Sequence, residues 1–182
     1  MAVNSYQQLP FLEPARARLL SHGGENMLAD TFLPFFRKND MEERFGLQIA
    51  HRHTDLDFDE KMVHYGNSAS PWRAMPGMPD PSPSAWAFFS SSNPVPIEYH
   101  YPGSVRKELN QRESSFMQDL AELQRSMGID GLFAACDHPG LDFQGSCEVT
   151  QGRSNINLKP EDVSLCCNSF QSRRLMIIIV SG

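Results

Sequence analysis

Hydrophobic and polar side chains alternate most regularly in the stretch from Leu47 to His53. One face of this extended segment carries Leu47, Ile49, His51 and His53, and the other carries Gln48, Ala50 and Arg52. Alternation with a period of two residues is typical of a strand with one buried face. The pattern therefore predicts that His51 and His53 both point into the protein, where their nitrogens can reach a shared partner.

Further stretches have the length and composition of strands. They are residues 60–65, 86–89, 97–101, 132–136, 146–150, 154–158 and 175–180. We expect residues 60–65 to form a hairpin with residues 47–53, because the segment between them is rich in aspartate, a residue that favours turns.

The spacing of apolar residues also predicts helices, over residues 13–21, 26–38 and 105–127. Pro34 should bend or interrupt the second of these. Asp40 has the features of a cap for one more helical turn. The third helix is the clearest, with Ser104 as its expected cap and Gly128 as its end.

Together these elements favour an α+β fold, with an antiparallel sheet or small barrel, N-terminal helices and one long central helix. A chain of 182 residues is large enough to bury its own core. We find no internal repeat and no domain boundary, so residues 1–182 are expected to form a single domain.

Residues 67–96 differ from the rest because they hold seven of the thirteen prolines and several serines. Such a stretch predicts a loop or lid, broken only by a short strand at 86–89. It also carries both tryptophans of the chain, Trp72 and Trp86. Large aromatic side chains prefer to be covered, so we expect one of them to form part of a pocket wall.

The charge and the apolar runs exclude several classes of partner. A net charge of −6 without any run of lysine or arginine argues against nucleic acid and against an anionic membrane surface. The N-terminus lacks the layout of a secretory signal, and the longest apolar run, 175–180, is too short to span a bilayer. We therefore expect a cytosolic protein. Its cysteines should then be reduced thiols: Cys136, Cys147, Cys166 and Cys167. The sequence carries no signal for the oligomeric state.

Several common catalytic motifs are missing. The chain has no glycine-rich phosphate loop, no dinucleotide fingerprint and no serine-hydrolase elbow. Cys136 and His138 are near neighbours in sequence, but adjacent residues of an extended chain point to opposite sides, so Cys136-Asp137-His138 cannot form a triad by itself.

A set of short motifs resembles a largely uncharacterised family of short proteins from filamentous fungi. The shared features are Arg44-Phe45-Gly46, His51-x-His53, Asp55-Leu56 and Glu60, followed by Pro83-Ser-Ala-Trp86, Pro96-Ile-Glu98-Tyr99 and the run from Glu148 to Arg153. The resemblance covers residues 43–101 and, more weakly, 145–158. It implies a fungal intracellular protein of the kind that can belong to a natural-product pathway, and it carries no catalytic assignment.

One hypothesis for the two histidines is a divalent metal site. Side chains at i and i+2 on a strand are parallel neighbours, so His51 and His53 can grip one ion. Adjacent strands could supply the third ligand, and the candidates are Glu60, His64, Glu98 and His100. The order of a His-x-His pair followed by a carboxylate is similar to that of a cupin, although every gap differs in length.

A second hypothesis needs no cofactor. His51 or His53 acts as general acid or base, and Asp55 or Glu60 fixes its tautomer. The remaining pocket residues, Trp72, Trp86, Glu98 and His100, would contact a small apolar molecule. Such a pocket suits a cyclase or isomerase that holds its substrate in a reactive conformation.

The third possibility is a noncatalytic binding or accessory protein, in which the same histidines only pack against their neighbours. All three readings stay open from the sequence. Elemental analysis of the purified protein would separate the metal enzyme from the other two.

Overall fold

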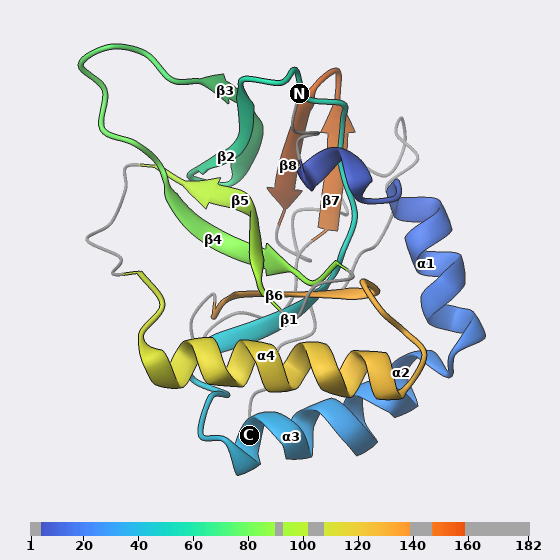
Figure 1. Ribbon diagram of the computed structural model, residues 1–182. Coiled ribbons are helices and arrows are strands. Elements are labelled where there is room, and N and C mark those ends of the chain that lie inside the picture. The colour runs from blue at the N-terminus through green and yellow to red at the C-terminus, as the bar shows by residue number, and fades with distance from the viewer. Residues whose placement is uncertain (1–4, 90–92, 102–107, 139–146, 159–182) are drawn as a thin grey trace.

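The structure is a half-barrel of strands with helices packed against one face. The computed structural model describes residues 5–89, 93–101, 108–138 and 147–158. In this part of the chain eight strands join in one curled sheet, with α3 and α4 lying against β1 and β6 (Figure 1). The fold is therefore α+β.

The helical elements are η1 (Ser5–Gln8), α1 (Leu12–Ser21), α2 (Gly24–Met27), the π-helical turn η2 (Leu28–Phe32), α3 (Leu33–Lys38) and α4 (Gln111–Ser126). Pro34 lies in the first turn of α3, directly after the π-helical turn. The irregularity predicted at this proline is thus a local widening of the helix.

α4 begins later than the sequence predicted. Asn110 caps it: the Asn110 Oδ1 accepts from the Glu113 backbone N–H at 2.9 Å, and the Glu113 side chain accepts from the Asn110 backbone N–H at 2.8 Å. This reciprocal pair satisfies two donors at the helix start. Ser104 and residues 105–107 lie outside the described residues. The turn expected after Asp40 is present as a single hydrogen-bonded turn, in which the backbone N–H groups of Phe45 and Arg44 donate to the Met41 carbonyl at 2.9 and 3.1 Å, and it extends into no helix.

The strands are β1 (Phe45–Ile49), β2 (Glu60–Tyr65), β3 (Ser68–Arg73), β4 (Ser82–Ala87), β5 (Val95–His100), β6 (Phe133–Asp137), β7 (Cys147–Gln151) and β8 (Ser154–Leu158). Their order in the sheet is β1-β6-β4-β5-β2-β3-β8-β7. β2 and β5 run parallel, so the sheet is mixed and the purely antiparallel prediction is wrong. The predicted hairpin between 47–53 and 60–65 is also wrong, because three strands separate β1 from β2. The strand predicted at 175–180 lies outside the described residues.

Residues 67–96 are not one long loop, since they contain β3, β4 and the start of β5. Prolines occur in all three strands, each where only one neighbour is paired. Pro71 lies beyond the β3 residues that pair with β8, Pro83 beyond the β4 residues that pair with β6, and Pro96 beyond the β5 residues that pair with β2. A proline lacks the N–H that a second neighbour would need, so these positions tolerate it. The prediction of a lid relied on the number of prolines, and it is wrong because these prolines are compatible with strands.

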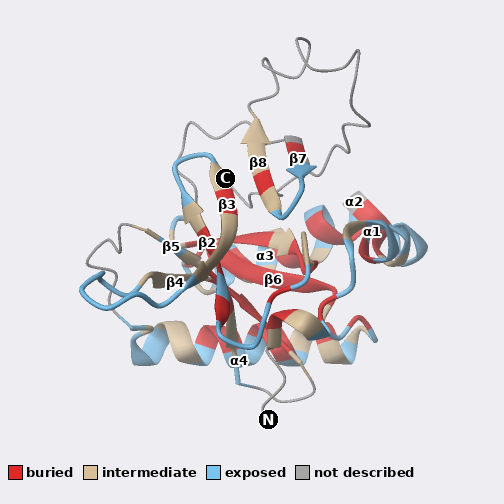
Figure 2. Ribbon diagram, turned by 90° about the horizontal axis from the view of Figure 1, so that it is seen from above, coloured by how far each residue is buried: buried red, intermediate tan, exposed pale blue. Residues whose placement is uncertain are grey.

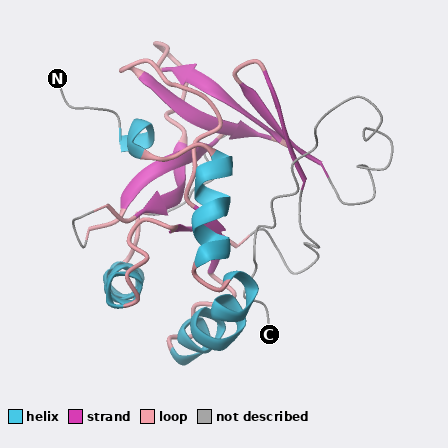
Figure 3. Ribbon diagram, turned by 90° about the vertical axis from the view of Figure 1, so that its right-hand side faces the viewer, coloured by secondary structure: helices cyan, strands magenta, loops and turns pink. Residues whose placement is uncertain are grey.

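The two faces of the sheet bury different residues. The helix-covered face is lined by large side chains that include Phe45, Leu47, Trp86 and Phe133. The inner face of the half-barrel carries small ones on β4 and β6, namely Ala85, Ala87, Ala134 and Cys136, and larger ones elsewhere, such as Met62 and Ile97. Figure 2 shows buried residues running through the middle of the sheet, and Figure 3 shows α3 and α4 below the strands, with α1 upright in front of them. Among the helices of the described ranges, none is long and apolar enough to cross a membrane.

Candidate functional site

The two histidines follow β1 rather than lie within it. The strand ends at Ile49, and the next residues are held by the N-terminal segment. The backbone N–H of Arg52 donates to the Pro10 carbonyl at 2.8 Å, and that of His53 donates to the Tyr6 hydroxyl at 2.8 Å. The predicted strand was therefore too long. Both imidazoles are nevertheless buried: His51 is 5% exposed, and the His53 side chain is 4% exposed.

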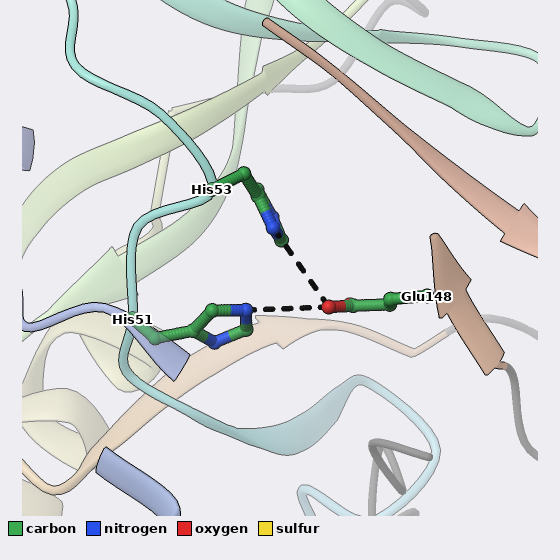
Figure 4. Close-up of side chains that lie close together, drawn as sticks. All are labelled: His51, His53 and Glu148. Carbon is green, nitrogen blue, oxygen red and sulfur yellow. Dashed lines mark hydrogen bonds and ion pairs between the residues drawn. The ribbon is translucent and has the colours of Figure 1, made fainter. Parts of the chain in front are cut away.

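Glu148 on β7 is the partner that the two histidines share. Its Oε2 lies 3.2 Å from His51 Nε2 and 3.8 Å from His53 Nδ1 (Figure 4). The rings of His51 and His53 meet edge to face, with their centroids 4.6 Å apart. One ligand atom from each of the three residues falls within 4.8 Å of the others, so this group could hold a metal ion. The prediction that the histidines reach a shared partner is confirmed, although the partner was not foreseen.

The site joins opposite ends of the sheet. β1 and β7 are the two edge strands of the half-barrel, and they are separated by all the other described strands. Because the sheet curls, residues that follow β1 reach a residue of β7 across the open seam. The His51–Glu148 contact thus links positions 97 residues apart in the chain.

The tautomers of the two histidines are set by acceptors on the far side of each ring. His51 Nδ1 lies 2.9 Å from the Ile49 carbonyl. A carbonyl only accepts, so Nδ1 carries the hydrogen, and the lone pair of a neutral ring is then on Nε2, facing Glu148. His53 Nε2 lies 3.3 Å from Glu98 Oε1, which leaves Nδ1 on the Glu148 side. When both rings are neutral, the electron pairs of His51 Nε2, His53 Nδ1 and the Glu148 carboxylate therefore face the same small space.

Glu98 on β5 is the buried carboxylate behind this group. It is 5% exposed, and three nitrogens approach it: His53 Nε2, His64 Nε2 at 3.2 Å and the Gln48 amide at 3.3 Å. Burial alone would raise the pKa of Glu98, but the hydrogen bonds from His53 and His64 hold it well below its usual range. Glu98 is thus a satisfied buried anion.

Two of the imidazoles bind protons more tightly than usual. Burial lowers the pKa of His51, but the hydrogen bond to Glu148 and its negative charge outweigh this effect, so the pKa is raised overall. The pKa of His64 is raised in the same way, with burial opposed by Glu98. In the absence of a metal ion, a proton can therefore lie between His51 and Glu148.

A pocket opens onto the histidines. Its cavity volume is about 300 Å³, and its lining consists of Phe11, Leu12, His51, Arg52, His53, Glu148 and Thr150. The Arg52 guanidinium stacks over the Phe11 ring at 4.2 Å and donates to the Gln7 carbonyl at 2.6 Å. Most of the lining is polar, and the cavity has room for a small molecule.

The predicted pocket tryptophans lie elsewhere. Trp86 is buried in the helix-side core, edge-on to Phe45 at 6.0 Å between centroids. Trp72 packs on Tyr101 at 5.1 Å between ring centroids and lines a separate pocket together with Met75. The prediction that a tryptophan forms part of a pocket wall is therefore confirmed for Trp72, but the pocket is not that of the histidines. Both lie in strands, Trp72 in β3 and Trp86 in β4, whereas the sequence had placed Trp72 in the loop and Trp86 in a short strand at 86–89.

The other predicted site residues lie outside the group formed by His51, His53 and Glu148. His64 reaches Glu98 rather than the His51 pair, and His100 is exposed with its ring stacked 6.5 Å from that of His64. Glu60 is buried, but it accepts from Arg153. Asp55 is exposed and lies 3.5 Å from Arg52 Nε, so it does not set either histidine tautomer.

Glu148 is the site residue that the sequence reasoning missed. In the sequence it belongs to the run from Glu148 to Arg153 that carries part of the resemblance. Its signal was a carboxylate within the strand predicted at 146–150, on the same face as Thr150, which also lines the pocket. Cys136 is a buried free thiol, and burial raises its pKa to about 12, which makes it a poor nucleophile.

No family model, curated protein or solved structure matches this chain, so the site is judged on its own geometry.

Proposed function

We propose that the chain binds one divalent transition metal ion through His51, His53 and Glu148, and that it is a metal-dependent enzyme acting on a small molecule in the adjoining pocket. The observation that carries this proposal is that one ligand atom from each of two imidazoles and a carboxylate lies within 4.8 Å of the others. When both rings are neutral, each of these atoms turns an electron pair towards the same space. Such an arrangement is unfavourable unless a cation or protons lie between the three groups.

The distances support an ion. Two ligands about 2.1 Å from one tetrahedral ion lie about 3.4 Å apart. The observed separations of Glu148 Oε2 from the two histidines, 3.2 and 3.8 Å, are close to this value. The ligand nitrogens of His51 and His53 lie within 4.8 Å of each other, and rotation of the side chains would bring them to this spacing.

The surroundings support it as well. Metal-binding histidines usually donate their second N–H to a carbonyl or carboxylate, which orients the ring. His51 has the Ile49 carbonyl in that place, and His53 has Glu98. A set of two histidines and one carboxylate is used for zinc and for non-haem iron(II), and it leaves coordination positions for substrate or water. An ion held this way polarises carbonyl groups and lowers the pKa of water.

The polar lining favours a substrate with polar groups near the reacting atoms. Thr150 and Arg52 are placed to orient such a molecule, while Phe11 and Leu12 supply apolar contact. The expectation of a cytosolic fungal protein from a natural-product pathway stays a prediction. The expectation of an apolar ligand also stays a prediction.

A second candidate function is metal-free acid–base catalysis by the same group, as in a cyclase or isomerase. The raised pKa of His51 favours this alternative, because a proton can take the place of the ion between His51 and Glu148. In that case His51 or His53 would exchange protons with the substrate.

Metal titration of chelator-treated protein tests the proposal. We expect one Zn²⁺ or, without oxygen, one Fe²⁺ per chain, measured by calorimetry. His51→Ala, His53→Ala and Glu148→Ala should each weaken binding by roughly 100-fold or more, since losing a direct ligand should exceed the loss of an outer partner. His22→Ala is the matched control, because His22 is exposed at the end of α1.

A wild-type protein that binds no ion would rule out the metal enzyme and leave the acid–base candidate. If wild-type binding is unaffected by all three substitutions, the ion lies elsewhere and the assignment of the site is wrong.

A further inference from the structure

The hairpin that carries Glu148 has few attachments to the rest of the described structure. β7 pairs only with β8, and β8 pairs with β3 through two residue pairs, Ser68 with Ile156 and Ala69 with Asn155. The Asn157 backbone N–H also donates to the Asn67 carbonyl at 2.7 Å. These contacts lie along one line, so they leave the tilt of β7 about β8 weakly determined.

Arg153, in the turn between β7 and β8, provides a contact away from that line. Its guanidinium donates to both carboxylate oxygens of Glu60, and to the Asp55 carbonyl at 2.8 Å. A two-pronged bond between guanidinium and carboxylate fixes orientation as well as distance.

Glu60 is a firm anchor for this contact. It is 8% exposed at the start of β2, and its Oε2 accepts from the Asp57 backbone N–H at 2.9 Å. The hydrogen bond from Arg153 lowers the pKa of Glu60, so the carboxylate is charged at neutral pH. Arg73 on β3 lies 3.8 Å from its Oε1 and adds a second positive charge.

We propose that Arg153 and Glu60 are positioning residues, which hold the β7–β8 hairpin at the tilt that brings Glu148 to His51 and His53. The proposal rests on the proposed function, since its effect is on metal binding. It gives Glu60 a role different from the catalytic one expected from the sequence: Glu60 acts on the site through the hairpin and does not touch it.

The test compares metal binding in Arg153→Ala, Glu148→Ala and the double variant. Arg153→Ala should weaken Zn²⁺ binding by about 10- to 100-fold, as loss of an outer supporting partner does. With Co²⁺ as a probe, its visible absorption should shift towards that of Glu148→Ala, because the carboxylate ligand is displaced. In the double variant the affinity should equal that of Glu148→Ala, since Arg153 then has no ligand to position.

Arg112→Ala is the matched control. Arg112 is an exposed arginine paired with Asp40 on the helical side, and its loss should leave Zn²⁺ affinity and the Co²⁺ spectrum unchanged. Glu60→Gln is the second variant, and it should repeat the Arg153→Ala spectrum with a smaller loss of affinity, because the amide can still accept one hydrogen bond.

The outcomes separate this inference from the proposed function. If wild-type protein binds Zn²⁺ and Arg153→Ala binds it equally well, only the positioning role is wrong. Losses that add in the double variant would also overturn it, because Arg153 would then act independently of Glu148. If wild-type protein binds no ion, both proposals fail.

Discussion

The two faces of the half-barrel differ in the polar side chains that they bury. On the helix-covered face aromatic rings pack closely: Phe116 is stacked on Phe45 at 5.7 Å between centroids and meets Phe36 edge-on at 5.0 Å. On the inner face small residues such as Ala134 and Cys136 lie beside larger apolar ones such as Met62 and Ile97, and buried imidazoles and carboxylates lie among them. One face is mainly apolar, and the other buries polar groups as well.

This difference separates the source of stability from the source of chemistry. Burial of large apolar side chains is the main stabilising contribution to a fold, and here it is concentrated against the helices. The buried polar groups lie in a continuous series, from Glu148 through His53 and Glu98 to His64. Substitutions on the two faces should therefore have different effects, on the free energy of unfolding on one side and on ion binding on the other.

The largest expected effect is on the helix-covered face. Phe116→Ala removes a buried ring that contacts three other phenylalanines, and should lower the free energy of unfolding by about 3–5 kcal/mol. Zn²⁺ affinity of the folded fraction should stay at the wild-type value. Urea unfolding and calorimetry measure the two quantities. Leu20→Ala, at an exposed position of α1, is the control that should change neither. A lower affinity in folded Phe116→Ala would show that the faces are coupled.

A smaller effect, on Zn²⁺ affinity, is expected at Glu98, which contacts His53 on the side away from Glu148. Glu98→Gln keeps the shape of the side chain, but its amide cannot accept from His53 and His64 as a carboxylate does. His53 is then less well oriented, and Zn²⁺ affinity should fall by about 10- to 100-fold. That corresponds to about 1.4–2.7 kcal/mol of binding free energy. Glu122→Gln on the exposed side of α4 is the matched control. Unchanged affinity in Glu98→Gln would mean that Glu98 has no part in orienting the ligand.

The smallest effect is on the pH dependence of stability, because burial and the carboxylates act on the histidines in opposite directions. In metal-free protein the pKa values of His51 and His64 are raised above their ordinary 6.5. The folded state holds these protons more tightly than the unfolded state. The resulting stabilisation is therefore complete below pH 6.5 and is lost as the pH rises through the folded values.

Bound Zn²⁺ should reverse this trend. The ion needs deprotonated imidazoles, so the stabilisation that it provides grows as the pH rises over the same range. Urea unfolding between pH 6 and 9, once with a chelator and once with Zn²⁺, should give a falling and a rising curve. Two curves of the same slope would show that the ion does not compete with protons at His51.

The sequence predicted those features that depend on local pattern, and it failed where distant segments meet. Alternation along Leu47–Ile49 located β1, and the unusual pair His51 and His53 identified one half of the site. The burial of both rings was predicted for the wrong reason. Leu47 and Ile49 pack on the helix-covered face, whereas His53 leaves the strand and reaches Glu98 on the inner face, as Gln48 does. Glu148 was out of reach, because the curl of the sheet and the docking of β7 bring it there, and neither is encoded in a short motif.

Trp86 and Pro71 show a related limit. Proline and tryptophan in one segment favoured a lid, yet Pro71 lies in β3 and Trp86 is in the core. What decides the outcome is which side of each strand is paired, and that depends on partners far along the chain.

The seam between β1 and β7 also bears on the order of folding. A contact between residues 51 and 148 closes a long segment of chain, and such contacts form late because the entropy of closure must first be offset by other interactions. The aromatic cluster also joins distant residues, Phe36 and Phe45 with Phe116, but among the described residues its contacts involve neither β7 nor β8. A group completed only when the last hairpin docks cannot nucleate the structure around an ion. Ion uptake during refolding would then follow the formation of the core and report its completion.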